Sequence, residues 1–167
     1  GTNAPSEVVG AVVFSAPCDL AEGADALDKP VNRIYKTRFM NRLVEKIHYK
    51  NKHFPGRLDI SKLKLVRRWR DFDEWFSAPM CSYKDAAEFH RESSPLNFIG
   101  GSKHPPMLLS AINDPFLLPN CFPVDIARTH PNFYLEMPEN GGHCGFMVKG
   151  SRHSWAELRT LEWVNQL

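Results

Sequence analysis

The sequence contains no apolar run near the ~20 residues that a membrane span requires, which excludes a transmembrane helix. Its net charge of +2 is too small to indicate a nucleic-acid partner. The first residues lack both the basic and the apolar segment of a signal peptide. We therefore expect a cytoplasmic location, no transmembrane span and no binding to nucleic acid.

Cysteines are few and far apart, at Cys18, Cys81, Cys121 and Cys144, and no Cys-x-x-Cys motif is present. Widely spaced cysteines of this kind favour reduced thiols, with disulfides or metal ligation as the less favoured alternatives. We accordingly expect no cofactor and no metal.

The motif Gly-x-Ser-x-Gly is also absent. In α/β-hydrolases this motif carries the serine nucleophile on a strand-to-helix turn that is too sharp for flanking side chains, so glycines are needed there. No serine of this chain has that context. If the chain belongs to such an enzyme, we expect it to be the C-terminal part, with the nucleophile upstream.

The length of 167 residues and the hydrophobic content of 43% suit one domain with a core. Apolar runs predict strands at 8–14, 106–112 and 132–137. The first run is continuous and β-branched, as in a strand buried on both faces of a parallel sheet. A short helix from Pro123 to about Arg128 joins the last two strands, which predicts a parallel βαβ unit and an α/β fold.

Residues 21–104 carry only helical and loop signals between two predicted strands. A long helix from about 28–30 to His48 has apolar residues at every fourth position. Its apolar positions are Val31, Tyr35, Phe39, Leu43 and Ile47. The opposite, basic face fits solvent, with anionic lipid or a partner as the alternative. We expect 21–104 to be a lid-like insertion, although a long crossover remains possible.

Further helix boundaries follow from capping signals. Asp59 is the expected N-cap of a short helix, and Ser82–Asp85 reads as a capping box opening a helix that ends before Pro95. Ser154 and Glu157 form a second capping box for the closing helix. The expected inner face of that closing helix consists of Trp155, Leu158, Leu161 and Val164.

Basic and aromatic residues alternate in the segment 67–79, a pattern that also occurs in nucleic-acid-binding surfaces. Here Asp71, Asp73 and Glu74 interrupt the positive field. Packing of the aromatic side chains near a site is the favoured interpretation.

Two residues stand where neighbouring parallel strands are predicted to end. Asp114 follows the run 106–112, and His143 follows 132–137 within a glycine-rich loop, Gly141–Gly145. Sites in open α/β sheets gather at the carboxyl ends of strands. A carboxylate that orients an imidazole is the acid–base part of a catalytic triad, so Asp114 and His143 are the candidate catalytic residues. Asp19, after the first run, fits a loop or cap better.

Two rival sites involve Cys144. A Cys144–His143 nucleophile pair is disfavoured, because adjacent residues rarely align sulfur with imidazole. A zinc site built from these residues and a distant ligand lacks the usual ligand spacing.

The segments Ala111-Ile112-Asn113-Asp114-Pro115-Phe116 and Gly141-Gly142-His143-Cys144-Gly145-Phe146 resemble the YheT-like family of α/β-hydrolases. The stretches 13–20, 70–79 and 94–95 add to this resemblance, which covers nearly the whole chain. It implies that 1–167 is the C-terminal part of one α/β-hydrolase domain. It also implies Asp114 as triad acid and His143 as triad base, without a metal. The family often has Asp where this chain has Asn113.

The resemblance implies a parent enzyme that cleaves carboxylic esters, possibly lipid esters, by a Ser-His-Asp mechanism. A small-molecule ester or lipid is then the expected substrate. A non-catalytic binding or scaffold protein and an acyltransferase are the alternatives. We expect the 167-residue chain to be inactive by itself and to self-associate through the exposed edge of 8–14.

Overall fold

The computed structural model describes residues 4–167, so the first three residues of the predicted domain 1–167 lie outside the described part. The chain divides into two compact units. We call residues 4–19 with 94–167 the sheet unit, and Leu20–Ser93 the helical unit. The helical unit begins one residue before the predicted insertion 21–104 and ends 11 residues before the predicted end.

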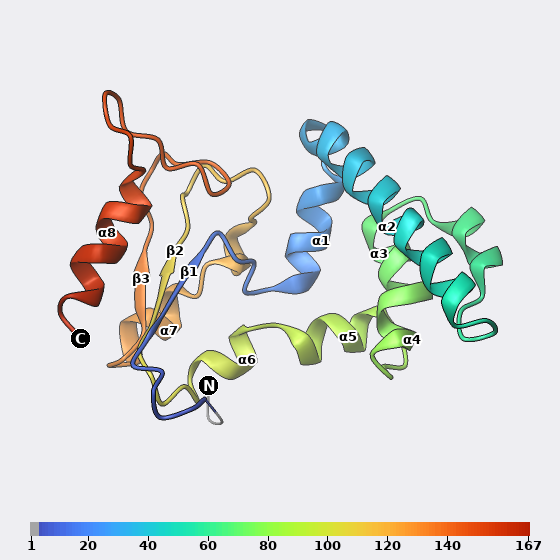
Figure 1. The fold of residues 1–167 in the computed structure, drawn as a ribbon, viewed down its shortest axis with the longest axis horizontal. Coiled ribbons are helices and arrows are strands. Elements are labelled where there is room, and N and C mark those ends of the chain that lie inside the picture. The colour runs from blue at the N-terminus through green and yellow to red at the C-terminus, as the bar shows by residue number, and fades with distance from the viewer. Residues whose placement is uncertain (1–3) are drawn as a thin grey trace. The chain divides into compact units, whose positions relative to one another are not determined.

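The sheet unit is built on three parallel strands (Figure 1). These are β1 (Ala11–Phe14), β2 (Pro106–Leu109) and β3 (Tyr134–Glu136), in the order β1-β2-β3. Ala11 pairs with Pro106, and Met107 pairs with Tyr134. The strands are parallel and flanked by helices, as the sequence predicts for an α/β fold.

Side chains of the central strand alternate between two apolar clusters, because successive strand residues point to opposite faces. Met107 and Leu109 pack with Trp163 of α8 (Trp155–Val164). Leu108 packs in the other cluster with Leu96 of α6 (Leu96–Ile99) and Ile126 of α7 (Val124–Thr129). The two clusters therefore place α8 on one face of the strands and α7 on the other, and Figure 1 shows α8 beside β3. The short η4 (Pro119–Cys121) precedes α7.

The expectation that the first strand is buried on both faces is wrong. β1 begins at Ala11, three residues later than predicted from the apolar run, and most of it is exposed. Val9 is 66% exposed, and Val13 and Phe14 are each 39% exposed. The reason is its position in the sheet: β1 pairs with β2 alone among the described residues, so its other edge is open.

The closing helix begins as predicted. The Ser154 hydroxyl accepts a hydrogen bond from the Glu157 N–H, and the Glu157 carboxylate accepts one from the Ser154 N–H, at 3.2 and 2.6 Å. The predicted inner face is right for Trp155, which packs against the core cluster, and wrong for the other three residues, since Ala156 and Trp163 are the buried ones. The exposed residues include Leu158, Leu161 and Val164.

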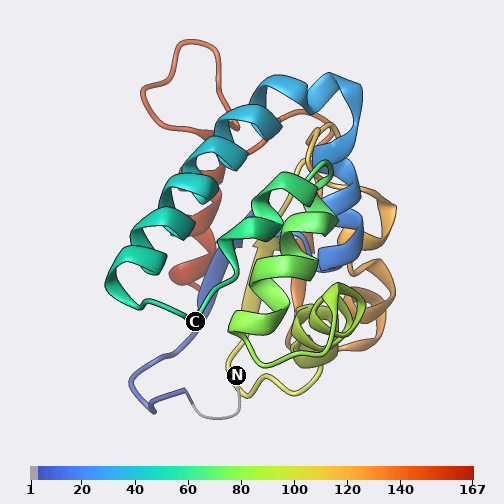
Figure 2. The same ribbon diagram turned by 90° about the vertical axis from the view of Figure 1, so that its right-hand side faces the viewer.

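The helical unit contains short helices around one long helix, α2 (Arg33–His53), which is the teal helix of Figure 2. Its core consists of Ile47, Phe72 and Phe76. The remaining elements are α1 (Leu20–Asp28), η1 (Pro30–Asn32), η2 (Ile60–Leu65), α3 (Trp69–Phe72), the π-turn η3 (Asp73–Ser77), α4 (Ala78–Met80) and α5 (Ala86–Ser93).

Ion pairs connect the first three helices of this unit. The Asp28 carboxylate accepts hydrogen bonds from the Lys36 ammonium at 2.6 Å and from the Trp69 N–H. The Arg70 guanidinium donates two bonds to Asp25, at 2.6 and 2.7 Å. Helices α1, α2 and α3 are thereby linked through side chains as well as through the core.

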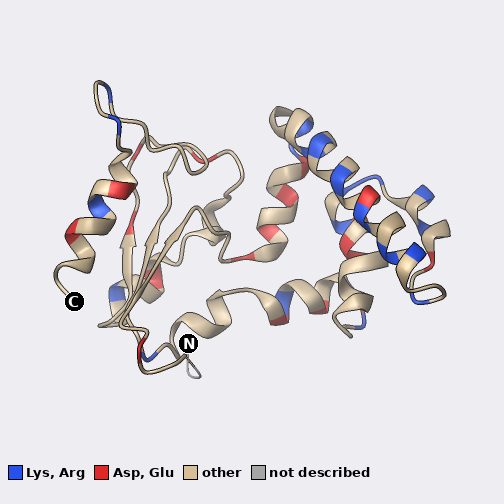
Figure 3. Cartoon of the chain, viewed as in Figure 1, with Lys and Arg blue, Asp and Glu red and all other residues tan. Residues whose placement is uncertain are grey.

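Helix α2 differs from its prediction in length and burial. It extends to His53, five residues beyond the expected end at His48, and stops at Phe54 before Pro55 and Gly56. Ile47 is its one buried residue, whereas Val31 and Tyr35 of the expected inner face are exposed. Lys and Arg recur along this helix, as the blue segments in Figure 3 show.

The predicted N-terminal capping is wrong for α5 and correct for η2. The Ser82–Asp85 box is wrong, because Ser82 has φ of 63° and α5 begins at Ala86. Asp85 instead accepts a bond from the Glu88 N–H at 2.8 Å. Asp59 caps η2 as predicted, by accepting a bond from the Ser61 N–H. Within residues 4–167, no helix combines the length and apolarity needed to cross a membrane.

Candidate active site

Asp114 lies in a turn that follows β2. Its N–H donates to the Ala111 carbonyl at 3.1 Å, and its Oδ1 accepts a bond from the Phe116 N–H at 2.9 Å. The Asp114 side chain is fully buried. A buried carboxylate held in this way cannot rotate freely, so its second oxygen, Oδ2, points in a fixed direction.

His143 meets that second oxygen. The distance between His143 Nδ1 and Asp114 Oδ2 is 3.0 Å, although 29 residues separate the two in sequence. The Phe116 ring and the imidazole pack in a T-shaped arrangement at a centroid distance of 4.6 Å. The His143 side chain is 39% exposed, so the imidazole is oriented on one side and open to a reacting molecule on the other.

The loop that carries His143 has an unusual backbone. Gly142, Cys144 and Phe146 all have positive φ, at 57°, 62° and 45°. Such values are uncommon for residues other than glycine. The Phe146 N–H closes the loop by donating to the Gly141 carbonyl at 2.9 Å. A Cβ at Gly141 would approach the Phe146 ring to 2.5 Å, so only glycine fits there.

The hydrogen bond fixes the chemistry available to the imidazole. An ionised carboxylate can only accept, so Nδ1 of a neutral His143 carries the proton. The Nε2 lone pair is then free to remove a proton from a hydroxyl or a water molecule. Within residues 4–167, Asp114 is the one hydrogen-bond partner of the His143 ring.

The Cys144 side chain is exposed, and its backbone N–H is hydrogen-bonded to Ser15. Its N–H donates to the Ser15 hydroxyl at 3.2 Å. Cys18, Cys81, Cys121 and Cys144 are all reduced. In the part of the chain that the structure describes, no three His, Cys, Asp or Glu side chains gather as metal ligands would.

A second histidine–carboxylate pair, which the sequence analysis missed, lies in the helical unit. His90 Nε2 of α5 is 2.8 Å from Asp73 Oδ2 at the start of η3. The side chains are only 3% and 9% exposed. This pair is sealed from reacting molecules, so it is a structural link between helices.

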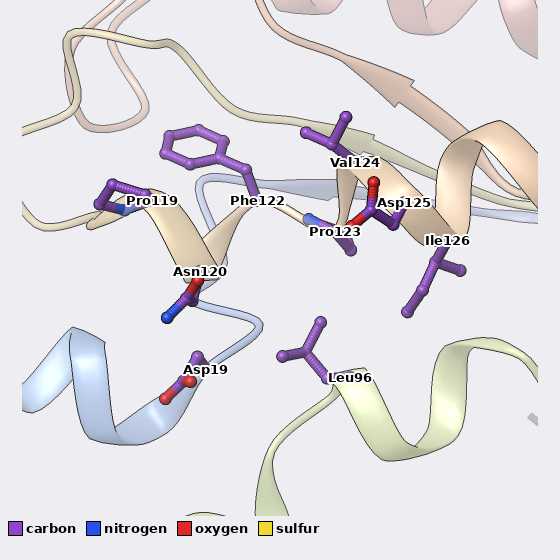
Figure 4. Close-up of a pocket in the computed structure, with 9 residues that line it drawn as sticks. All are labelled: Asp19, Leu96, Pro119, Asn120, Phe122, Pro123, Val124, Asp125 and Ile126. Atoms are coloured by element: carbon purple, nitrogen blue, oxygen red, sulfur yellow. The ribbon is translucent and has the colours of Figure 1, made fainter.

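Asp19 lies apart from the Asp114–His143 pair and lines a cavity of about 390 Å³ in the sheet unit. Figure 4 shows Leu96 and Ile126 facing each other across this cavity, with Asn120 near Asp19. Neither Asp114 nor His143 lines it. Asp19 is therefore a cavity residue outside the candidate catalytic pair.

The sequence analysis also missed residues that support the pair. Asn113 accepts hydrogen bonds from the backbone of the His143 loop, as does Ser15, and Phe116 packs on the imidazole. The signal for Asn113 and Phe116 was their place beside Asp114 in Asn-Asp-Pro-Phe. Nothing in the sequence pattern marks Ser15.

Comparison with curated proteins gives ester-cleaving relatives. The "Putative esterase YheT" of Escherichia coli (strain K12) is 30% identical over 94% of this chain and 47% of its own length. Phospholipase ABHD3 of Bos taurus is 24% identical over 82% of this chain and 34% of its own length. Monoacylglycerol lipase of Saccharomyces cerevisiae is 32% identical over 56% of this chain and 20% of its own length.

This chain spans about half the length of the Escherichia coli relative and a smaller share of the length of the other two. No family model matches the sequence, and no solved structure matches the fold.

Proposed function

This chain belongs to the YheT-like family of α/β-hydrolases, and we propose that the protein containing it hydrolyses carboxylic esters with Asp114 and His143 as triad acid and base. The observation that carries the proposal is the 3.0 Å hydrogen bond between the buried Asp114 carboxylate and the partly open His143 imidazole. Asp114 follows β2 and His143 follows β3, and these two strands are adjacent and parallel. The carboxyl ends of such strands are where α/β enzymes hold their sites.

In the proposed reaction, His143 Nε2 removes the proton of a serine hydroxyl, whose oxygen forms a bond to the ester carbonyl carbon. The tetrahedral intermediate expels the alcohol, which takes the proton from His143. Water then repeats the sequence on the acyl-enzyme and releases the acid. Asp114 keeps the imidazole in one tautomer and stabilises its protonated form. The serine belongs, in this proposal, to the part of the relatives' length that this chain does not span.

The substrate class follows from the relatives. They are named as a putative esterase, a phospholipase and a monoacylglycerol lipase, and these activities share the cleavage of carboxylic esters. A lipid ester is therefore the favoured substrate. The helical unit interrupts the sheet unit in sequence between β1 and α6, and we propose that it acts as a lid over the substrate.

A fluorophosphonate probe, which labels activated serines, tests this proposal. Four proteins are compared: the full-length natural protein, its His143→Ala variant, its His48→Ala variant and the 167-residue chain. His48 is an exposed histidine of α2 and serves as the matched control. We expect labelling of the full-length protein and of His48→Ala only.

Two results would overturn the proposal. Labelling of His143→Ala at the full rate would remove His143 from the mechanism. Absence of labelling in the full-length protein would favour a non-catalytic binding protein on a hydrolase fold. Product analysis with added alcohol separates hydrolysis from acyl transfer.

A further inference from the structure

We propose that Asn113 and Ser15 are positioning residues that hold the His143 loop from two strands, so that the imidazole meets Asp114 in one tautomer. This inference rests on the proposed function, because both residues act through His143. Both residues accept hydrogen bonds from the backbone of the loop.

Asn113 anchors the loop before His143. Its side-chain carbonyl oxygen accepts hydrogen bonds from the Gly141 N–H at 3.1 Å and the Gly142 N–H at 2.8 Å. Its amide group donates to the Asn140 side chain at a longer 3.3 Å. Because Asn113 directly precedes Asp114, the turn after β2 binds both the loop backbone and the imidazole.

Ser15 anchors the loop after His143. Its hydroxyl oxygen accepts a hydrogen bond from the Cys144 N–H at 3.2 Å. Ser15 directly follows β1, is 2% exposed and has φ of 50°. Its own N–H donates to the Leu109 carbonyl at 2.8 Å, which fixes the hydroxyl relative to β2.

His143 thus lies between two anchored residues, Gly142 and Cys144. Each donates its N–H to a side chain from a different part of the sheet unit. Cys144 has φ of 62°, a conformation that a residue other than glycine keeps only when surrounding contacts determine it. Without these acceptors the loop could relax, and the imidazole would no longer be held along the Asp114 Oδ2 direction.

The anchor before His143 is also neutral. A carboxylate at position 113 would accept the same two N–H bonds and would add a second negative charge beside Asp114. Asn113→Asp therefore separates geometry from charge. Asn113→Leu has nearly the same shape as asparagine and removes both acceptor bonds. Asn140→Ala removes the acceptor of the hydrogen bond that the Asn113 amide group donates. It leaves in place both hydrogen bonds that Asn113 accepts from the loop.

The test has two readouts on the full-length natural protein. Long-range ¹H–¹⁵N correlation of ¹⁵N-histidine reports which ring nitrogen of neutral His143 carries the proton, independently of catalysis. Ester hydrolysis gives kcat and KM separately. We expect the Nδ1–H tautomer in the unmodified protein, in Asn140→Ala and in Asn113→Asp.

In Asn113→Leu and in Ser15→Ala we expect a mixture of tautomers. We also expect kcat to fall, by up to about 100-fold for a misplaced base, with KM little changed. An unaltered tautomer and an unaltered kcat in both variants would overturn the inference, as would a mixture in Asn140→Ala equal to that in Asn113→Leu.

If the proposed function is wrong, the experiments give a different result from the one expected if the positioning role is wrong. A protein that shows the expected tautomers but takes no fluorophosphonate and hydrolyses no ester supports the positioning role and rejects the hydrolase. If Asn113→Leu does not fold, Ser15→Ala and Asn113→Ala answer the same question from the two sides of the loop.

Discussion

At the scale of residues, burial separates the histidine–carboxylate pairs of the described chain. Asp114–His143 and Asp73–His90 have similar hydrogen bonds, of 3.0 and 2.8 Å. The imidazole of His143 is 39% exposed and that of His90 only 3% exposed. The same chemical pair therefore suits proton transfer in one place and helix packing in the other.

We expect His90→Ala to destabilise the helical unit, because it leaves the Asp73 carboxylate buried without its imidazole partner. Breaking a buried pair of this kind costs about 3–5 kcal/mol. Urea unfolding followed by circular dichroism measures the loss. His48→Ala, at an exposed position of α2, should change the free energy of unfolding by about 0.5 kcal/mol or less. Equal effects of the two substitutions would contradict a structural role for His90.

The cysteines give a second prediction at this scale. Burial, and to a smaller extent the nearby Cys121, raises the pKa of the Cys18 thiol from 9.0 to about 12. The neutral thiol thus favours the folded state below pH 9, and this contribution is lost as pH rises from 9 toward 12. Cys81 and Cys144 are exposed, whereas Cys18 and Cys121 are buried.

Iodoacetamide reacts with thiolates, so at pH 8 we expect alkylation of Cys81 and Cys144 in the folded protein and of Cys18 only after unfolding. Peptide mass spectrometry identifies the modified residues. Rapid labelling of Cys18 in the folded protein would show that its thiol is more accessible than the structure indicates.

At the scale of elements, α8 depends on a reciprocal cap. Hydrogen bonds from the Ser154 N–H and hydroxyl lower the pKa of the Glu157 carboxyl below its ordinary 4.5. A lowered pKa in the folded state means that this contribution to stability is present above about pH 4.5 and is lost as pH falls further.

We expect Ser154→Ala to lower the free energy of unfolding by about 1 kcal/mol at neutral pH, because the Glu157 N–H loses its acceptor. Glu157→Gln keeps an oxygen acceptor but cannot ionise, so it should weaken the fall in stability below pH 4.5. Thermal unfolding from pH 3 to 7 measures both effects. A pH dependence that is identical in Glu157→Gln and the unmodified chain would refute the role of this carboxyl.

At the scale of the whole molecule, the open edge of β1 has a consequence for association. Val13 and Phe14 of β1 are exposed, as is Val9 before it, and the second edge of this strand is unpaired among residues 4–167. Exposed apolar edges of this kind pair with other chains. We propose that the 167-residue chain self-associates through β1.

Light scattering over a range of concentrations tests this association. The average mass of the 167-residue chain should rise with concentration. Val13→Lys places a charge on the exposed edge and should keep the chain monomeric. A clean monomer of the unmodified chain at high concentration would rule out edge pairing.

The sequence by itself determined which segments form parallel strands, the capping of α8 and the residues Asp114 and His143 that meet at the sheet edge. These features depend on local patterns: apolar runs, a capping box, and the places where strands end. Local patterns also placed β2, α7 and β3 in the correct order.

Only the tertiary structure decided which apolar faces are covered. Periodicity identifies an apolar face but not whether a partner packs on it, which explains the errors for β1, α2 and α8. The contacts of Ser15 with Cys144 and of Asp73 with His90 were equally invisible, because no local pattern marks these residues as pairs. Such contacts arise from the folding of the chain in space, and no spacing along a single sequence encodes them.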